Sequence, residues 1–314
     1  MALPKWGFFM KKVYADKTLP YGKNLYFEEP ADMASNPIYA DQQFANIVNQ
    51  GDSNSLSEDQ GNGDAIDFIN EPLSEIPIES QLSGITMFNL TEDQRAIQEV
   101  AQRFTADHIT PFAAGWDERH EFPRETIRRA AELGFGAIYV SEESGGIGLG
   151  RLEAALIMEA MAYGCPPTSA FISIHNMASW IIDTYGSPAL KAKYLPQLVG
   201  MDLFASYCLT EPGSGSDAAA LATTARRDGA HYVVNGTKQF ISGAGENDIY
   251  VTMVRTGEDG PKGISCLVID KDMPGVSFGA PEKKLGWHAQ PTAALILEDV
   301  RVPVENLVGN EGEG

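Results

Sequence analysis

Residues 207–217 read YCLTEPGSGSD, a β-prone run that passes directly into a turn with two glycines. Glycine lets backbone N–H groups approach a ligand closely, and a nest of such groups suits an anion such as a pyrophosphate. The hydroxyls of Thr210, Ser214 and Ser216 add further donors. By itself, such a turn is more often an ordinary surface turn, so it indicates a phosphate site only if other segments agree.

Two segments further along the chain could complete such a site. Residues 240–244 read FISGA and follow Asn235-Gly236, a dipeptide that predicts a hairpin turn between two strands. An aromatic ring and a hydroxyl there could cover a flat ligand, although core packing is the commoner role. Residues 285–292 read LGWHAQPT and lead into another strand. A lone histidine such as His288, or His175 upstream, is usually a satisfied structural group.

Before residue 200 the pattern is helical. Thr91 and Gln94 form a capping box ahead of an amphipathic run, near the start of the folded region at Phe88. Further helices are predicted at 124–133, 151–163, 175–185 and 188–199. A glycine follows each of these runs and predicts a left-handed C-cap, at Gly134, Gly164, Gly186 and Gly200.

From residue 202 onward the period changes to that of strands. Short β-prone runs, separated by glycines and charged turns, occur at 204–209, 231–234, 250–255, 264–269 and 294–297. A helical block followed by a strand block predicts an α+β protein rather than an alternating α/β fold. We therefore expect an acidic extension or linker of unknown role over 1–86, an all-helical domain over 88–200 and a β domain over 201–314.

The composition excludes several classes of function. The 314 residues carry a formal net charge of −20, which disfavours nucleic acid as a partner. Three widely spaced cysteines without a Cys-x-x-Cys pair argue for a reducing compartment and against a disulfide framework or a metal site. No run approaches the roughly 18 apolar residues of a membrane span. The N-terminal residues resemble neither a signal peptide nor a transit peptide.

Taken together, the order of these segments resembles the acyl-CoA dehydrogenase family over residues 88–314. Three stretches are similar to its isobutyryl-CoA branch, namely WHAQPT at 287–292, SIHNM at 173–177 and GPKGISC at 260–266. The resemblance implies an α+β fold, with an N-terminal all-helical domain followed by a β-barrel-like middle domain. It also implies that the family's C-terminal helical bundle is absent from these 314 residues.

The resemblance further implies a site for FAD. The expected cofactor contacts are Tyr207, Cys208, Leu209, Thr210, Gly213, Ser214, Gly215, Ser216, Phe240, Ile241 and Ser242. Thr210 and Ser242 are expected beside the isoalloxazine ring, and Ser216 is also expected to touch the acyl-CoA. Glu211 and Asp217 are expected to be structural. No catalytic residue is assigned, because the family's carboxylate base is expected beyond residue 314, and no metal ligand is assigned.

The implied reaction is the FAD-dependent α,β-dehydrogenation of a short branched-chain acyl-CoA, as in valine degradation, with this polypeptide expected to be inactive alone. The resemblance implies electron transfer flavoprotein as the acceptor and a homotetramer. The expected location is the cytoplasm of a bacterium or the mitochondrial matrix of a eukaryote. Two alternatives remain. One is a flavin monooxygenase or oxidase of the same fold, and the other is a non-catalytic remnant that binds another protein.

Overall fold

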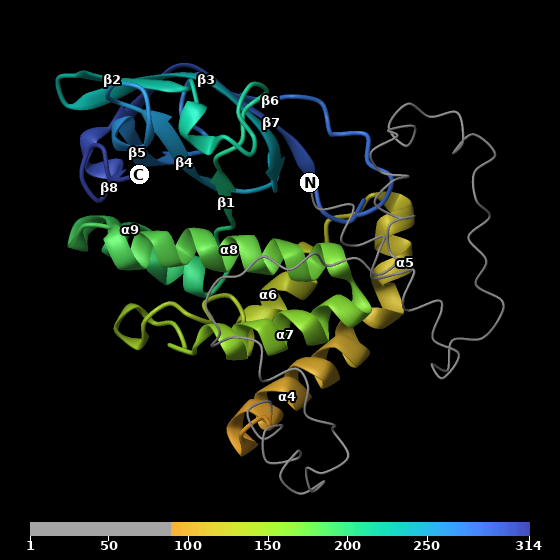
Figure 1. The fold of residues 1–314 in the computed structure, drawn as a ribbon. Coiled ribbons are helices and arrows are strands. Elements are labelled where there is room, and N and C mark those ends of the chain that lie inside the picture. Colours follow the sequence, from red (N-terminus) through yellow and green to blue (C-terminus); the bar gives the residue numbers. More distant parts are fainter. Residues whose placement is uncertain (1–88) are drawn as a thin grey trace, which may run out of the picture. The chain divides into compact units, whose positions relative to one another are not determined.

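Helices form the first part of the structure (Figure 1), a computed structural model that describes residues 89–314. The described residues belong to one compact unit, Ile78–Gly314. The extension predicted over 1–86 lies outside them. The α-helices are α4 (Glu92–His108), α5 (Thr110–Arg119), α6 (Arg124–Glu132), α7 (Arg151–Gly164), α8 (Pro166–Tyr185) and α9 (Pro188–Val199).

Local signals explain where α4 begins, whereas packing explains the length of α8. The predicted capping box is present, since Gln94 N–H donates to Thr91 Oγ1 at 3.2 Å and Thr91 N–H donates to Gln94 Oε1 at 3.0 Å. Helix α8 begins at Pro166, well before the predicted start near residue 175. Its first turns hold proline, threonine, serine and isoleucine, which are not strong helix formers. Phe171 and Ile172 are fully buried there, so burial in the helical core outweighs propensity.

Three of the four glycines predicted to be left-handed caps have ordinary backbone angles, so the prediction was wrong for them. Gly134 is left-handed, with φ of +81°. Gly164 is the last residue of α7, Gly186 has φ of −69° and Gly200 has φ of −80°. Close approach explains the glycine at 186, because a Cβ there would lie 2.4 Å from the backbone oxygen of Ile182.

The strands follow the helices and form one sheet. They are β1 (Ala205–Cys208), β2 (Thr224–Asp228), β3 (His231–Ser242), β4 (Ile249–Arg255), β5 (Ile264–Asp270), β6 (Val276–Phe278), β7 (Thr292–Pro303) and β8 (Leu307–Val308). Their order is β6-β7-β3-β2-β4-β5-β8, and β1 pairs in parallel with β4. Helices first and strands afterwards confirm the predicted α+β class.

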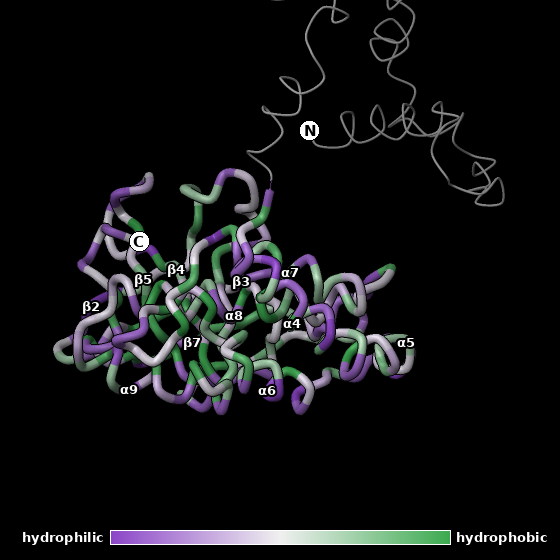
Figure 2. Tube along the Cα trace, turned by 90° about the horizontal axis from the view of Figure 1, so that it is seen from below, coloured by the Kyte–Doolittle hydropathy of each residue, from purple (hydrophilic) through white to green (hydrophobic). Residues whose placement is uncertain are grey.

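Strands β4 and β5 are buried on both faces, which explains their continuous apolar sequences. One face, including Val251, packs on Ile182 of α8 and Leu198 of α9. The other face, including Tyr250 and Leu267, packs inside the β core against β3 and β7. Figure 1 shows α8 running beneath the sheet, and Figure 2 shows hydrophobic stretches along these central elements. The helices and the sheet therefore share a core, with β1 at their junction.

The hairpin predicted at Asn235-Gly236 was wrong, because both residues lie inside β3. The turn comes earlier, between β2 and β3, where Asp228 pairs with His231. The register of β3 against β7 shifts between Val234 and Gly236, and the extra residue of this β-bulge lies on β7, opposite Asn235. Gly236 has φ of +153°, and a Cβ there would lie 2.7 Å from Thr223 Cα. Glycine at position 236 thus lets β3 pass close to the chain that enters β2.

Replacing Gly236 by alanine should lower the free energy of unfolding by about 2–4 kcal/mol, because the methyl group overlaps Thr223 and the backbone keeps a positive φ. Gly229→Ala is the matched control, since its φ is +61° but nothing lies within 4 Å of its Cβ position. That control should lose only about 1–2 kcal/mol. Urea unfolding followed by circular dichroism compares the two. Equal losses would contradict the steric explanation.

Candidate functional site

The loop after β1 and the end of β3 lie side by side. Gln239 N–H donates to Thr210 C=O at 2.7 Å, and the Ser206 hydroxyl donates to Ser242 C=O at 2.7 Å. Because β1 also pairs with β4, it lies between β4 and the end of β3. The two segments singled out in the sequence are therefore neighbours, at the junction between the sheet and α8 (Figure 1).

Alternation along β1 divides the predicted contact residues between two faces. Tyr207 and Leu209 are partly buried and pack beside the core formed with α8 and α9. Cys208 is fully buried in the β core, and burial raises the pKa of its thiol to about 12. Ile241 is buried in the same core. Cys208 and Ile241 can therefore reach a ligand only through their backbone atoms.

Phe240 projects from the end of β3. Its side chain is 62% exposed and its φ is +59°, a backbone angle that is uncommon outside glycine. The pairing of β3 with β7 shifts register between Lys238 and Ile241, so a second bulge turns the ring out of the sheet. Ser242 follows and is partly exposed. An exposed ring on a strained backbone offers a ready surface for a flat ligand.

The glycine turn after Glu211 leaves backbone donors available. The N–H groups of Gly213, Gly215 and Ser216 make no hydrogen bond within residues 89–314. Nothing lies within 4 Å of a Cβ position at either glycine. Ser214 differs, because its hydroxyl donates to Asp217 C=O at 2.7 Å and its N–H donates to Glu211 C=O at 3.1 Å. The hydroxyl and the N–H of Ser214 therefore both donate within the loop, although Ser214 was predicted to contribute to the anion site.

Glu211 is held by three donors. Its carboxylate accepts from Ala222 N–H at 2.6 Å, Thr223 N–H at 3.0 Å and Lys238 Nζ at 2.7 Å. Burial acts to raise the pKa of this carboxyl, but the bonds from Lys238, Thr223 and Ala222 hold it below its usual value. A carboxylate stabilised in its charged form is a weak proton acceptor. The geometry therefore matches the structural role predicted for Glu211.

The two histidines expected to be structural have protein partners. His288 Nδ1 lies 3.1 Å from Asp117 Oδ2, and its Nε2 lies 3.0 Å from Lys284 C=O. The ring of His120 stacks on that of His288, with centroids 4.3 Å apart. The bond to Asp117 raises the pKa of His288 and links the loop before β7 to α5. His175 is fully buried between α8, α9 and β1.

Comparison with known proteins places these elements in a family. Residues 91–202 match the N-terminal domain of acyl-CoA dehydrogenases, and residues 206–300 match the middle domain. The chain belongs to the acyl-CoA dehydrogenase family. The resemblance stated from the sequence is confirmed.

The relatives define what this acyl-CoA dehydrogenase chain is similar to. The mitochondrial isobutyryl-CoA dehydrogenase of Dictyostelium discoideum is 58% identical over 226 residues, and that of Bos taurus is 55% identical over 225. Each match covers 72% of this chain and 54% of the relative, so the chain spans about half the length of these relatives. A solved FAD complex of the protein PigA is 33% identical, with a TM-score of 0.70, over 72% of this chain and 60% of its own.

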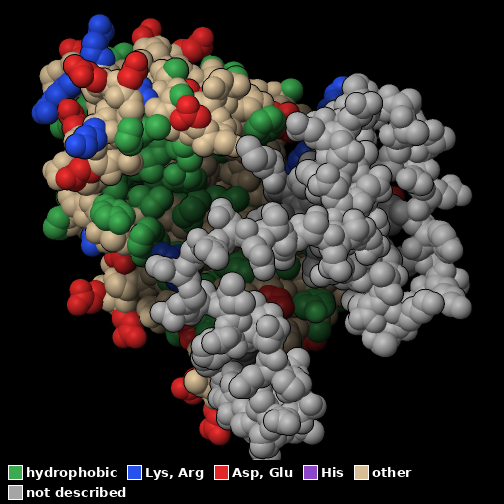
Figure 3. Space-filling view, viewed as in Figure 1, with side chains coloured by type: hydrophobic (Ala, Val, Ile, Leu, Met, Phe, Trp, Pro, Cys, Tyr) green, Lys and Arg blue, Asp and Glu red, His purple; other side chains and the backbone are tan. Residues whose placement is uncertain are grey.

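The acyl-CoA dehydrogenase family consists of FAD-dependent oxidoreductases, and the residues at the junction fit this cofactor. The free N–H groups of Gly213, Gly215 and Ser216 suit a diphosphate. The ring of Phe240 and the partly exposed Tyr207 offer apolar surface to a flat ring system. Figure 3 shows hydrophobic side chains gathered on the face between the sheet and the α8–α9 pair.

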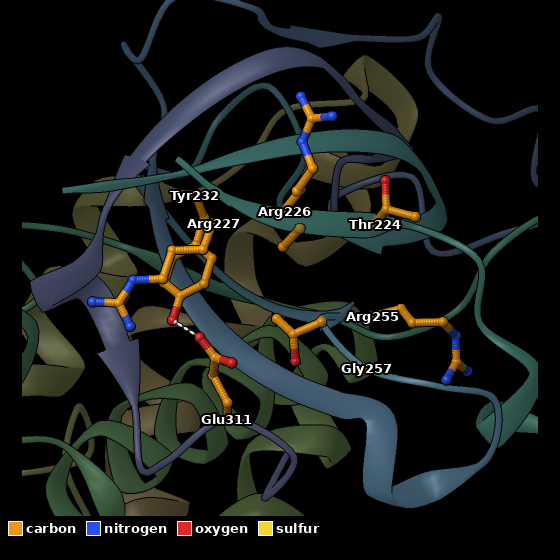
Figure 4. Close-up of a pocket in the computed structure, with 9 residues that line it drawn as sticks. Thr224, Arg226, Arg227, Tyr232, Arg255, Gly257 and Glu311 are labelled. Atoms are coloured by element: carbon orange, nitrogen blue, oxygen red, sulfur yellow. Dashed lines mark hydrogen bonds between the residues drawn. The ribbon is translucent and has the colours of Figure 1, made fainter. Parts of the chain in front are cut away.

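A separate pocket lies beside β2 (Figure 4). Its volume is about 310 Å³, and its walls include Arg226, Arg227 and Tyr232, whose hydroxyl donates to Glu311 Oε1 at 2.5 Å. None of the predicted flavin contacts lines it. Within the described part of the chain, no group of His, Cys, Asp and Glu is arranged for a metal ion. No helix there is long and apolar enough to cross a bilayer.

Proposed function

We propose that this chain supplies the FAD-facing and acyl-CoA-facing surface of an enzyme that dehydrogenates a short branched acyl-CoA of the isobutyryl-CoA type. The observation that carries the proposal is the adjacency of two segments. The bond from Gln239 to Thr210 and the bond from Ser206 to Ser242 join them. The names of the two relatives that are 55–58% identical support the substrate class.

Each part of the junction has a proposed role toward the ligands. When bound, FAD supplies the redox chemistry by accepting a hydride from the β-carbon of the acyl group. The N–H groups of Gly213, Gly215 and Ser216 hold the diphosphate, and Ser216 also contacts the acyl-CoA. The hydroxyls of Thr210 and Ser242 donate to the edge of the ring system.

Removal of the α-proton needs a positioned base, because that proton is only weakly acidic. Glu211 does not fill this role, because its carboxylate is already bonded to Lys238 and to two backbone N–H groups. Asp217 lies exposed in the loop, and its C=O accepts from Ser214. We assign the base to no described residue. The proposal that the polypeptide is inactive alone rests on this point.

Further parts of the proposal concern location, acceptor and assembly. The mitochondrial names of both relatives favour a mitochondrial location. Electron transfer flavoprotein is the proposed acceptor, and the homotetramer implied by the resemblance stays a prediction. Turnover by the FAD-loaded chain with an artificial electron acceptor under nitrogen would contradict the proposed inactivity, and turnover that requires air would indicate an oxidase or a monooxygenase. A non-catalytic remnant would bind neither FAD nor acyl-CoA.

Removing one ring-edge hydroxyl should weaken FAD binding. Thr210→Val and Ser242→Ala should each raise the Kd for FAD about 2- to 10-fold, which corresponds to one hydrogen bond. Quenching of flavin fluorescence measures the Kd. Ser277→Ala is the control, because Ser277 lies exposed on β6, and its Kd should match that of the wild type. If the wild-type chain binds no FAD, or if all variants bind it equally, the proposed contacts are wrong.

A further inference from the structure

Lys238 carries its charge in the protein interior. It lies in β3 with a completely buried side chain, and its Nζ lies 2.7 Å from Glu211 Oε1 and 3.1 Å from Leu209 C=O. Burial lowers the pKa of this ammonium group, and the hydrogen bond to Glu211 opposes the shift. A buried ammonium without a partner is strongly unfavourable. The contacts with the loop after β1 therefore keep Lys238 charged in the core.

Glu211 connects this contact to a third segment. Its carboxylate also accepts from Ala222 and Thr223, where the chain enters β2. Glu211 N–H donates to Ser214 C=O at 2.9 Å, and Ser214 N–H donates to Glu211 C=O at 3.1 Å. These two bonds close the glycine turn. One carboxylate thus fixes the loop after β1 to β3 and to the start of β2.

The ion pair stands directly beside the residues proposed to contact FAD. Thr210 precedes Glu211, and Phe240 lies two residues after Lys238. Between them, Gln239 N–H donates to Thr210 C=O at 2.7 Å. Any shift of Glu211 against Lys238 moves Thr210 against the end of β3.

We propose that Lys238 and Glu211 are a positioning pair, which holds the loop after β1 in register with the end of β3 so that both segments meet FAD. The inference rests on the proposed function. Neither side chain needs to touch the cofactor, because the pair acts through Thr210 and Phe240. Apolar replacement of a buried ion pair is often neutral for stability. We therefore attribute to the Lys238–Glu211 pair the arrangement of the two segments rather than a gain in stability.

Two variants separate arrangement from stability. Lys238→Met removes one charge and leaves Glu211 buried beside Ala222 and Thr223. Lys238→Met/Glu211→Gln removes both charges, and the amide oxygen still accepts from one of those two N–H groups, which bond to different carboxylate oxygens. The control removes the surface pair Arg301–Asp228, which is 2.8 Å apart and more than half exposed, as Arg301→Met/Asp228→Asn. Such a pair contributes little to stability.

Two readouts are made on the full chain. Hydrogen exchange in the absence of FAD measures the exchange rate of the Gln239 amide. Quenching of flavin fluorescence measures the Kd of the folded protein for FAD. In both Lys238 variants, we expect exchange at Gln239 to be at least about tenfold faster and the Kd to rise at least about tenfold. The double variant should lose less of its urea midpoint than Lys238→Met, because it leaves no unpaired buried charge. The control pair should change neither quantity.

A purely structural pair gives a different result. It would lower the urea midpoint and speed exchange at the core amides alike, with no additional effect at Gln239 and an unchanged Kd of the folded fraction, and that outcome overturns the proposal. Because the exchange measurement needs no cofactor, it decides the positioning role even if the wild-type chain fails to bind FAD. Failure to bind FAD would count against the proposed function alone.

Discussion

Acidification from pH 7 to pH 4 should cost the folded domain about 3 kcal/mol through His175 alone. The ring is fully buried, its Nδ1 accepts from Ala205 N–H at 3.1 Å, and its Nε2 lies 2.9 Å from Leu198 C=O. A backbone N–H can only donate, so Nδ1 carries no proton and Nε2 donates to Leu198. The neutral ring thus satisfies two buried backbone groups where α8, α9 and β1 meet.

The direction of this effect follows from the shift in the pKa of His175. Burial lowers it from 6.5 to about 4, while the hydrogen bond to Leu198 and the charge of Asp248 act weakly in the opposite direction. Between these two values the unfolded chain binds a proton that the folded chain does not, so stability rises with pH. The contribution is complete above about pH 6.5 and is lost progressively as the pH falls toward 4.

Urea midpoints between pH 7 and pH 4.5 measure this loss for the wild type and for His175→Gln. The variant should be less stable at pH 7, but its stability should fall less steeply with decreasing pH. The other titratable groups are the same in both proteins, so their contributions cancel in the difference between the two pH curves. Parallel pH curves would refute a neutral, buried His175.

Replacing Asn176 by alanine should lower the free energy of unfolding by about 3–5 kcal/mol. The side chain is fully buried, its Oδ1 accepts from Ile138 N–H at 2.6 Å, and its Nδ2 donates to Phe135 C=O at 2.8 Å and to Ile172 C=O at 2.9 Å. Alanine leaves the groups of Ile138 and Phe135 buried without a partner, at about 1–3 kcal/mol each. It also leaves a cavity beneath α8.

Asn235→Ala is the matched control for Asn176→Ala. Asn235 also makes two side-chain hydrogen bonds, both with Asp299, but it is exposed, so water replaces them. We expect a loss of about 1 kcal/mol or less for this control. Thermal and urea unfolding of both variants provide the comparison. A similar loss in the two proteins would mean that the buried bonds of Asn176 are not what holds α8 to the segment before it.

Several features of the site were readable in the sequence because they are local. The strand, the glycine turn and the neighbouring hydroxyls of residues 207–217 stand next to each other in the chain. Glu211, His175 and His288 were expected to be structural, and each has several protein partners. Lys238 was not singled out, although it continues the inward alternation of Tyr232 and Val234 along β3. A lysine in a polar stretch is ordinarily a solvated residue.

The sequence by itself determined the order of helices and strands, the family and the two segments of the candidate site, since hydrophobic period, capping residues and short motifs act over a few neighbouring residues. Only the tertiary structure decided that Gly236 lies inside β3, that Phe240 turns outward and that the hydroxyl of Ser214 donates within its own loop. It also decided the partner of Lys238, which lies 27 residues away. A buried charge is stable only where the folded chain brings such a distant partner to it.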